Sequence, residues 1–564
     1  MLATQLARVL VEHGVSHVFG VVGNGNFHIA DGMAAAGARY VPARHEGGAV
    51  AMADAHHRVS GQVAVCTTTY GPGFTNAATG LAEAAKHGSG VLVVCGDAPT
   101  AGRRRIDVDQ PALAAALGAE TVVVTDPASA TTTAVAALTR ARAENRPIIL
   151  AVPGDLLEQP VPTPPRDVPT PSTRRTAHPP PTPGSVPAVA GEVDAVAVDA
   201  VVEVLVRAER PLLLAGLGAW RAGAGALLEK LGERVGALLA TTVMADGIFA
   251  GNPWSLGICG GFSAPPAAEL IAEADVVVAF GAGLGHWTLH GGAMLGAGTT
   301  LVQVDLAAPT TGRVDLAVPG DAARVAAALL AGVEARGVAP SGRRAGLAGL
   351  VARSGWRDQP YTDAGTGTRI DPRTLTLALA DLLPADRTLV TDGGHFIAWP
   401  AMYWPSADPS ALVFTGAAFQ TIGLGFAGAV GAAVARPDRT VVAALGDGGA
   451  LMGLPELETL IRTVPSALVV IYDDAAYGAE VHMYGDAGAA SPTTVFTDTD
   501  FAGTARALGA TAATVRTVED LAPVRAWHAD GRRGVLVLDC KVVRSVVARM
   551  LAGQGPTQTP EHTP

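Results

Sequence analysis

Cysteine and charge are both scarce in this chain of 564 residues. The four cysteines (Cys66, Cys95, Cys259 and Cys540) are widely spaced and form no CxxC pair, so neither a disulfide scaffold nor a cysteine zinc site is indicated. This usage favours a reducing, cytoplasmic location. Charged residues make up only 16% of the chain and hydrophobic residues 49%, which excludes a mainly disordered protein and predicts extensive buried surface, part of it between subunits.

An excess of basic residues is also missing. Lys and Arg together number 40 against 51 Asp and Glu, giving a net charge of −11. Such a balance argues against nucleic acid and acidic membranes as partners and leaves small molecules open.

No segment is predicted to cross a membrane. The first apolar stretch contains Arg8, Glu12 and His13, which argues against a signal peptide or an N-terminal span. Residues 409–435 carry no charge and are long enough to cross a bilayer, but glycines and polar residues interrupt them. We expect a buried loop and helix there.

Short apolar runs that end in Gly, Asp or Thr recur along the chain, and alanine-rich stretches with helical spacing lie between them. Examples are VAVCTT (63–68), VLVVCGD (91–97), DVVVAFG (275–281), TVVAALGDGG (440–449) and ALVVIYDD (467–474). The alternation of strand and helix predicts an α/β fold of three doubly wound domains with parallel sheets.

Two breaks in composition divide these units. The segment from Pro160 to Pro187 is too rich in proline for a helix or a central strand, and Gly, Ser and Arg interrupt the apolar pattern between 332 and 367. The predicted units are a first domain (1–160), a proline-rich linker (161–189), a middle domain (190–335), a second linker (336–364), a last domain (365–550) and a tail (551–564).

Acidic residues follow two strands of the last domain. Asp447, within Gly446-Asp447-Gly448, comes directly after one strand, and Asp473-Asp474 end the next. Carboxyl ends of parallel strands share one sheet edge, where ligands bind in open α/β folds. Carboxylates suit Mg²⁺ and a glycine-rich turn exposes N–H groups, so a metal-bridged diphosphate fits. The alternative is a pair of ordinary turns with Asp as helix cap.

A second candidate group lies near the N-terminus. Glu46, in Arg44-His45-Glu46-Gly47-Gly48, follows an apolar strand and precedes an alanine-rich helix, so its carboxylate is expected to be poorly solvated and to need a partner or a proton. The alternative is an ordinary acidic residue at a helix start.

Together these groups resemble the thiamine diphosphate enzymes of the acetolactate synthase, benzoylformate decarboxylase and pyruvate decarboxylase type. RHEGGAVAMADAHHRVSG and TTTYGPGFTNAATGLAEA resemble that family's pyrimidine-binding domain, and GDGGALMGLPELETLIRTVPSALVVIYDDAAYG resembles its diphosphate-binding domain. The resemblance extends over nearly the whole chain, including a middle domain.

The resemblance implies a role for each matching residue. Glu46 would hydrogen-bond the aminopyrimidine ring, the carbonyl of Gln420 would receive its 4'-amino group, and Ile422 would support the bent cofactor. Asp447, Asp474 and the carbonyl of Ala476 would bind Mg²⁺. The diphosphate would lie against Gly394, His395, Gly446, Gly448 and Gly449.

Two departures bear on the reaction. The family usually has Asn-Asn where this chain has Asp473-Asp474, which adds negative charge to the metal site, and AAYGAEVHMYGD replaces the Gln-Trp segment of the acetolactate synthases. By resemblance Glu480 matches a glutamate of the decarboxylases, and Gln110 lies where synthases place a substrate-side Gln. His28 is a further catalytic candidate, or else a surface histidine, and His482 is expected beside Glu480.

The resemblance therefore implies a thiamine diphosphate- and Mg²⁺-dependent decarboxylase or carboligase, acetolactate synthase-like, that forms an enamine from a 2-oxo acid and gives it to a proton or a second carbonyl. It also implies a homodimer or homotetramer with sites between subunits. An empty middle domain is favoured over FAD, because Gly281 to Gly285 lack the GxGxxG spacing. The alternatives are a C–C hydrolase or lyase on the same cofactor, a binding relative without turnover, and a protein that binds FAD or NAD.

Overall fold

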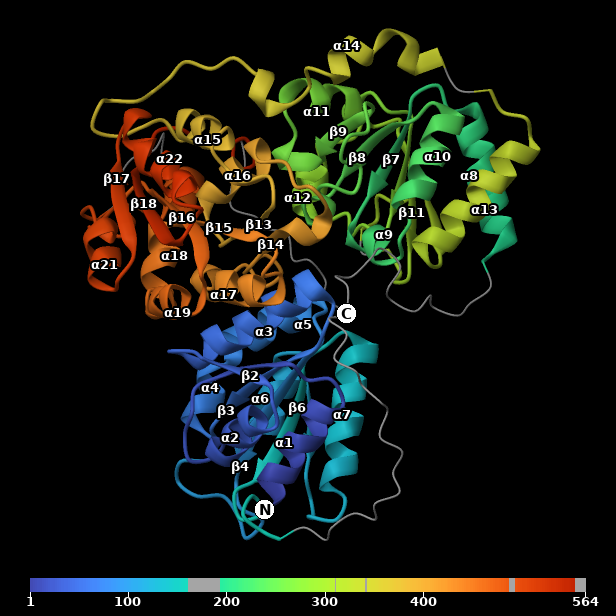
Figure 1. Ribbon diagram of the computed structural model, residues 1–564. Helices are drawn as coiled ribbons and strands as arrows, with labels where there is room; N and C mark the ends of the chain where they lie inside the picture. Colours follow the sequence, from blue (N-terminus) through green and yellow to red (C-terminus); the bar gives the residue numbers. More distant parts are fainter. Residues whose placement is uncertain (161–192, 310, 340–341, 486–491, 553–564) are drawn as a thin grey trace.

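Three parallel sheets of six strands each organise the computed structural model (Figure 1). The structure describes residues 1–160, 193–309, 311–339, 342–485 and 492–552. The predicted linker of residues 161–189 lies outside this part, as does most of the predicted tail from 551 to 564. Helices cover both faces of each sheet, and the predicted α/β class with three doubly wound parallel sheets is confirmed.

The N-terminal sheet has the order β2-β1-β3-β4-β6-β5. Its strands are β1 His17–Gly20, β2 Arg39–Pro42, β3 Ala64–Thr68, β4 Val91–Asp97, β5 Glu120–Val123 and β6 Ile148–Pro153. Its helices are α1 Leu2–Glu12, α2 Phe27–Ala35, α3 Glu46–Ser60, α4 Pro72–Asn76, α5 Ala78–His87, α6 Gln110–Ala116 and α7 Ala130–Glu144. Alternate residues of β4 enter two cores: Val93 packs in the core with α3 and α5, and Leu92 in the one with α1 and α7.

The middle sheet has the order β12-β11-β10-β7-β8-β9. Its strands are β7 Pro211–Ala215, β8 Leu238–Thr241, β9 Ser255–Ile258, β10 Val276–Phe280, β11 Thr300–Asp305 and β12 Leu316–Pro319. Its helices are α8 Ala195–Arg207, α9 Leu217–Arg221, α10 Gly225–Val235, α11 Pro265–Ala272, α12 His286–Leu289 and α13 Ala322–Ala335. The short helix α14 Ala348–Val351 lies in the segment predicted as the second linker.

The C-terminal sheet has the order β14-β13-β15-β16-β18-β17, which repeats the order of the N-terminal sheet strand for strand. Its strands are β13 Arg387–Thr391, β14 Leu412–Phe414, β15 Thr440–Gly446, β16 Ser466–Asp473, β17 Thr511–Val515 and β18 Gly534–Lys541. Its helices are α15 Pro372–Ala380, α16 Ala398–Tyr403, α17 Gly425–Ala435, α18 Asp447–Met452, α19 Pro455–Thr463, α20 Gly478–Tyr484, α21 Phe501–Ala507 and α22 Ala522–Ala529.

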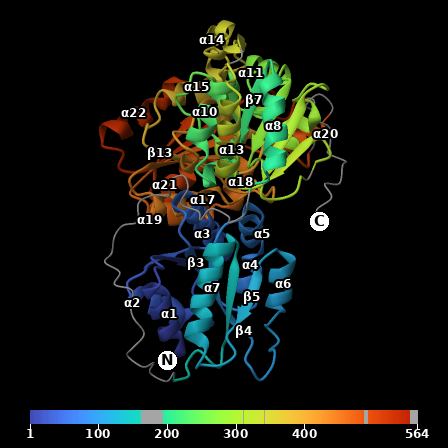
Figure 2. The ribbon, with the colours of Figure 1, turned by 90° about the vertical axis from the view of Figure 1, so that its right-hand side faces the viewer.

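The N-terminal and C-terminal domains meet through α3 and α17, and one hydrophobic core continues across the contact (Figures 1 and 2). The two helices approach so closely that a side chain at Gly431 would collide with the carbonyl of Met52. Helix α17 is the end of the uncharged segment 409–435, which forms β14, a loop and this buried helix. Among the described residues, no helix combines the length and hydropathy that a membrane span requires.

Candidate active site

Three predicted groups meet at the carboxyl edge of the C-terminal sheet. Strands β13, β15 and β16 are neighbours in that order, and they lead into Asp392, Asp447 and Asp474, respectively. The tips of adjacent parallel strands lie side by side. The fold thus brings the acidic turns and the glycine-rich loop 393–394 to one place.

Asp447 and Asp474 form an acidic pair at this edge. The Asp447 side chain is largely buried, and burial together with the charges of Asp474 and Asp473 raises its pKa to about 8. Burial also raises the pKa of Asp474 to about 6. Two carboxylates in such an environment are costly to ionise unless a cation accompanies them.

The donor set fits a magnesium ion held partly by other ligands. In the described part of the chain, no group of three or more His, Cys, Asp and Glu side chains could hold a metal. Mg²⁺ commonly takes one or two carboxylates and completes its shell with water and phosphate oxygens. The carbonyl of Ala476 is a candidate third ligand, because the bridge between Ala476 and Val495 uses the Tyr477 N–H and the Ala475 carbonyl instead.

Asp473 belongs to a different arrangement. Its carboxylate lies 2.5 Å from Nζ of Lys541, which also lies 2.8 Å from Asp539. All three side chains are almost fully buried. The extra negative charge predicted for the metal site is therefore offset at Asp473, and Asp474 remains as the acidic neighbour of Asp447. Sequence analysis missed Lys541, whose signal is a lysine directly after an apolar strand.

The rings of His395 and His482 pack edge to face near Asp474, with their centroids 4.4 Å apart. Nε2 of His395 accepts the N–H of Ala548 at 2.8 Å, which leaves Nδ1 as the protonated nitrogen. Burial and His482 lower the pKa of His395 to about 3, so its ring is neutral. Nε2 of His482 is buried and has no hydrogen-bond partner among the described residues. Glu480, on the same helix α20, is exposed.

The loop with Gln420 and Ile422 lies against the tips of β13 and β15. The N–H of Gly423 donates to Oδ2 of Asp392 at 2.8 Å, and side chains at Gly393 or Gly449 would crowd Ile422 and Asp392, respectively. Gln420 has a φ of 58°, a conformation rarely adopted outside glycine. Asp392, fully buried, is a second residue that sequence analysis missed, although it directly precedes the Gly-Gly pair.

Glu46 begins α3, and its side chain is largely buried. Its Oε2 accepts a hydrogen bond from Nδ2 of Asn76 at 3.0 Å. The N–H of His45 donates to Oε1 of Glu456 at 2.9 Å, which fixes the start of α3 on the start of α19. A side chain at Gly423 would in turn crowd Met452, which lies just before α19. The structure therefore fixes the helix that Glu46 begins on α19, which directly follows the segment that Gly423 contacts.

Two predicted catalytic residues, Gln110 and His28, make their contacts within the N-terminal domain. The side chain of Gln110 is buried and accepts the Gly71 N–H at 3.0 Å while donating to the Gly96 carbonyl at 3.0 Å, so its amide ties the turn after β3 to the end of β4. His28 lies on α2, 3.7 Å from Glu158. The contacts of these two side chains involve none of the other predicted site residues.

The glycine-rich turn of the middle domain packs on its own neighbour. Gly216 and Gly281 follow the adjacent strands β7 and β10, and the N–H of Gly218 donates to the Gly281 carbonyl at 3.0 Å. A side chain at Gly216 would collide with that carbonyl. Backbone thus occupies the position between these strand tips, where dinucleotides bind in sheets of this strand order.

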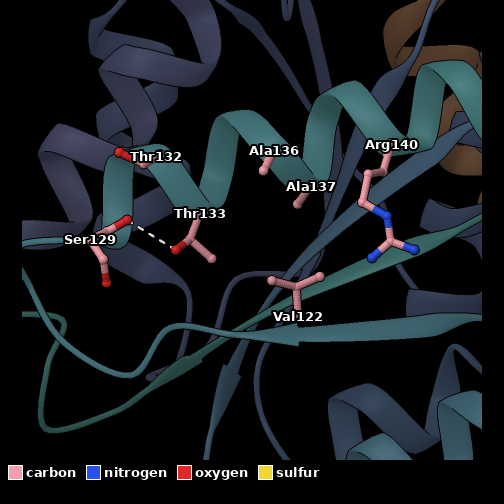
Figure 3. A pocket seen from close by; sticks show the side chains of 7 residues that line it. All are labelled: Val122, Ser129, Thr132, Thr133, Ala136, Ala137 and Arg140. Carbon is pink, nitrogen blue, oxygen red and sulfur yellow. Dashed lines mark hydrogen bonds between the residues drawn. The ribbon is translucent and has the colours of Figure 1, made fainter.

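Two cavities lie away from these groups. One of about 350 Å³ lies between β5 and α7 and is lined mainly by small side chains, with Arg140 at one end (Figure 3). Another of about 310 Å³ lies at the ends of β11 and β12. Neither is lined by a predicted site residue.

Comparison with known proteins gives the family. Residues 1–116 match the model described as "Thiamine pyrophosphate enzyme, N-terminal TPP binding domain", residues 198–329 match its central domain, and residues 392–540 match its C-terminal TPP binding domain. The three matched segments lie, in this order, in the N-terminal, middle and C-terminal domains.

Curated relatives agree. The chain is 30% identical over 489 residues to an acetolactate synthase large subunit of Parasynechococcus marenigrum, which covers 83% of this chain and 75% of that protein. It is 30% identical over 488 residues to a probable 2-ketoarginine decarboxylase of Pseudomonas aeruginosa, covering 83% and 80%. It is 28% identical over 548 residues to a sulfoacetaldehyde acetyltransferase of Castellaniella defragrans, covering 91% and 88%. The resemblance inferred from the motifs is thus confirmed, and the chain belongs to the thiamine pyrophosphate enzyme family.

Proposed function

We propose that this protein is a thiamine diphosphate- and Mg²⁺-dependent enzyme that decarboxylates a 2-oxo acid and passes the remaining unit to a proton or to a second carbonyl compound. The observations that support the proposal are that Asp447 and Asp474 follow neighbouring strands, that the loop ending in Gly423 lies against Asp392 and Gly449, and that the helix begun by Glu46 is hydrogen-bonded to α19 of the C-terminal domain. Relatives named for synthase, decarboxylase and acetyltransferase reactions support the shared chemistry rather than one product.

The C-terminal half would hold the charged end of the cofactor. Asp447, Asp474 and the Ala476 carbonyl would bind Mg²⁺, and a divalent ion would offset the burial and the neighbouring negative charge that raise both carboxyl pKa values. Backbone N–H groups of the turns with Gly446, Gly448, Gly449 and Gly394 would donate to diphosphate oxygens. Nδ1–H of the neutral His395 would add a donor without adding charge.

Glu46 and the 420–422 loop would hold the ring end. Glu46 would share a proton with the ring nitrogen, with Asn76 fixing the orientation of its carboxyl group. The Gln420 carbonyl would accept the ring's amino group, and Ile422 would support the bent conformation. When bound, the cofactor supplies the nucleophilic carbon and the electron sink, and the protein supplies orientation and a poorly hydrated surrounding.

Residues of α20 and of the N-terminal domain are proposed for the substrate side of the site. We propose that Glu480 and His482, both on α20, border the entrance and contact the 2-oxo acid or the acceptor. His28 is proposed to contact the acceptor from the N-terminal domain, and Gln110 to act by holding the turn after β3. We favour a middle domain without FAD, since backbone closes the β7–β10 tips.

We further propose a cytoplasmic homodimer or homotetramer with sites between subunits. The α3–α17 contact occurs here within one chain, and the same contact made between two chains would place Glu46 of one against Asp447 of the other. Mixing inactive Glu46→Gln and Asp447→Asn proteins decides this point. Recovered activity in the mixed oligomer supports shared sites, and no recovery after subunit exchange contradicts them.

Identification of the small molecule and metal that co-purify with the protein tests the proposal, followed by assays with carboxyl-labelled 2-oxo acids and a panel of aldehyde acceptors. We expect thiamine diphosphate, Mg²⁺ and release of labelled CO₂. Bound cofactor with C–C cleavage but no CO₂ release would instead indicate a hydrolase or lyase. Bound cofactor without any turnover would indicate a binding protein, and a flavin or nicotinamide would overturn the proposal.

A further inference from the structure

Two buried glutamates cross the boundary between the N-terminal and C-terminal domains in opposite directions. Glu83, on α5, accepts the N–H of Phe419 at 2.7 Å and that of Ala418 at 3.3 Å. Glu456, on α19, accepts the N–H groups of Arg44 at 3.0 Å and His45 at 2.9 Å. Each carboxylate thus binds two consecutive peptide N–H groups of the other domain.

The position of these N–H groups relates them to the proposed site. Phe419 directly precedes Gln420, and His45 directly precedes Glu46. Glu83 therefore holds the residue before Gln420, and Glu456 holds the residue before Glu46. Because a hydrogen-bonded peptide group restricts the torsions on both sides, each contact limits how its neighbour can move.

Glu83 is part of a wider buried network. Its Oε1 lies 2.8 Å from Nη2 of Arg58, which also binds Asp54 at 2.6 Å. Nη1 of Arg58 donates to the Phe414 carbonyl at 2.8 Å. The C-terminal segment that leads to Gln420 is consequently held at Phe414 by Arg58 and at Phe419 by Glu83.

The held segment needs such support. Gln420 has a left-handed φ of 58°, and strained conformations of this kind persist only when the surrounding structure over-determines them. On its other side, the Gly423 N–H is fixed by Asp392 of its own domain. The loop that carries Gln420 and Ile422 is thus fixed by the C-terminal domain at one end and by the N-terminal domain at the other.

The apolar contact of α3 with α17 is sufficient reason for the two domains to adhere. Buried ionic groups add little to such adhesion, because their desolvation offsets their attraction. They do restrict geometry, since a carboxylate that receives two N–H groups has one favourable position.

We propose that Glu83 and Glu456 are positioning residues that set the separation between Glu46 and the Gln420–Ile422 loop. In this role they strengthen binding of the cofactor's ring and leave binding of its diphosphate unchanged. This inference rests on the proposed function of that site. It assigns the two glutamates a role that neither the metal ligands nor Glu46 perform.

Glu83→Gln and Glu456→Gln test the proposal, because each keeps the size of the side chain and removes its charge. Calorimetric titration compares thiamine diphosphate with pyrophosphate, each in the presence of Mg²⁺, and urea unfolding is recorded in parallel. We expect each variant to lose about tenfold or more in affinity for thiamine diphosphate and to keep its affinity for pyrophosphate within about twofold. Glu458→Gln, a partly exposed neighbour paired with Arg44, is the matched control and is expected to bind both ligands normally.

An equal loss for both ligands would show a merely structural role, and no loss for either would show no role; both overturn the proposal. Should Glu83→Gln not fold, Arg58→Lys replaces it, since lysine keeps the charge but cannot contact Asp54, Glu83 and the Phe414 carbonyl together. We then expect Arg58→Lys, too, to lose affinity for thiamine diphosphate and to keep its affinity for pyrophosphate. Failure of the unaltered protein to bind thiamine diphosphate would instead overturn the proposed function.

Discussion

The N-terminal and C-terminal sheets have the same strand order, but their carboxyl edges carry different chemistry. In the C-terminal domain this edge carries Asp392, Asp447 and Asp474, together with glycine turns that leave no room for a side chain at Gly446, Gly448 or Gly449. In the N-terminal domain Glu46 follows β2, and its amide neighbour Asn76 binds it. The same topology thus presents three aspartates at one edge, where we propose a metal and a diphosphate bind, and a single buried glutamate at the other.

The difference shows that topology decides where a site forms and that the residues at the strand tips decide what it does. Asp392 and Asp447 follow β13 and β15, between which the strand order of the C-terminal sheet reverses, whereas Glu46 follows β2 at the border of the N-terminal sheet. The contact of α3 with α17 then brings the two edges together. We propose that each half of the site is incomplete without the other.

The largest expected effect comes from the N-terminal half. We expect Glu46→Gln to slow proton exchange at the reactive carbon of the cofactor by about a hundredfold to ten-thousandfold, because general acid–base action requires the carboxyl proton. Exchange into deuterated water, followed by NMR after acid quench, measures it. Glu458→Gln is expected to exchange at the normal rate, and an unchanged rate in Glu46→Gln would refute the assigned role.

A buried ion triad supports the C-terminal half alone. Lys541→Met leaves Asp473 and Asp539 without their cation, and removing one partner of a buried pair typically costs about 3–5 kcal/mol in the free energy of unfolding. Urea unfolding near pH 7 measures the loss. Arg532→Met, which removes an exposed pair with Asp386, is expected to cost less than about 1 kcal/mol. Equal losses in both variants would contradict the interpretation of the triad.

The contact between the halves is tested at the helix crossing. Gly431→Ala would push α17 away from the carbonyl of Met52, and we expect a loss of about 1–3 kcal/mol in the free energy of unfolding together with weaker cofactor binding. Gly349→Ala, in the open helix α14, is the control and should be neutral or stabilising by up to about 1 kcal/mol. Similar results for both would mean that the crossing tolerates separation.

The smallest effect concerns the pH dependence of the metal-free protein. Because the pKa of folded Asp447 is about 8 against an ordinary 3.8, the folded state binds more protons than the unfolded state between about pH 4 and pH 8. The free energy of unfolding should therefore fall as the pH rises through this window. Asp447→Asn should remove that decline and be more stable than the unaltered protein at pH 8 by about 1 kcal/mol or more. Unfolding in EDTA at pH 4, 6 and 8 measures it, and an unchanged slope would refute the assignment.

The sequence predicted the class of the fold and the grouping of Asp447 with Asp474, because both depend on the local alternation of strands and helices. It did not reveal that Asp473 is neutralised by Lys541, since that pair joins strands 68 positions apart. Nor did it reveal the surroundings of Gln110, which resemblance places where synthases carry a substrate-side Gln and whose buried amide is engaged by backbone groups on both sides. Burial of a polar side chain depends on neighbours that local pattern does not specify.

The order of apolar runs, glycine turns and acidic strand ends by itself determined that this chain forms three parallel α/β sheets and which strand tips carry oxygen ligands. Only the tertiary structure decided that α3 packs on α17, and that Glu83 and Glu456 bind across the boundary the residues that precede Gln420 and Glu46. The physical reason is range: strand and helix periodicity arises from neighbours within a few residues, whereas buried carboxylates select their donors from whatever the packing of distant helices brings within 3 Å.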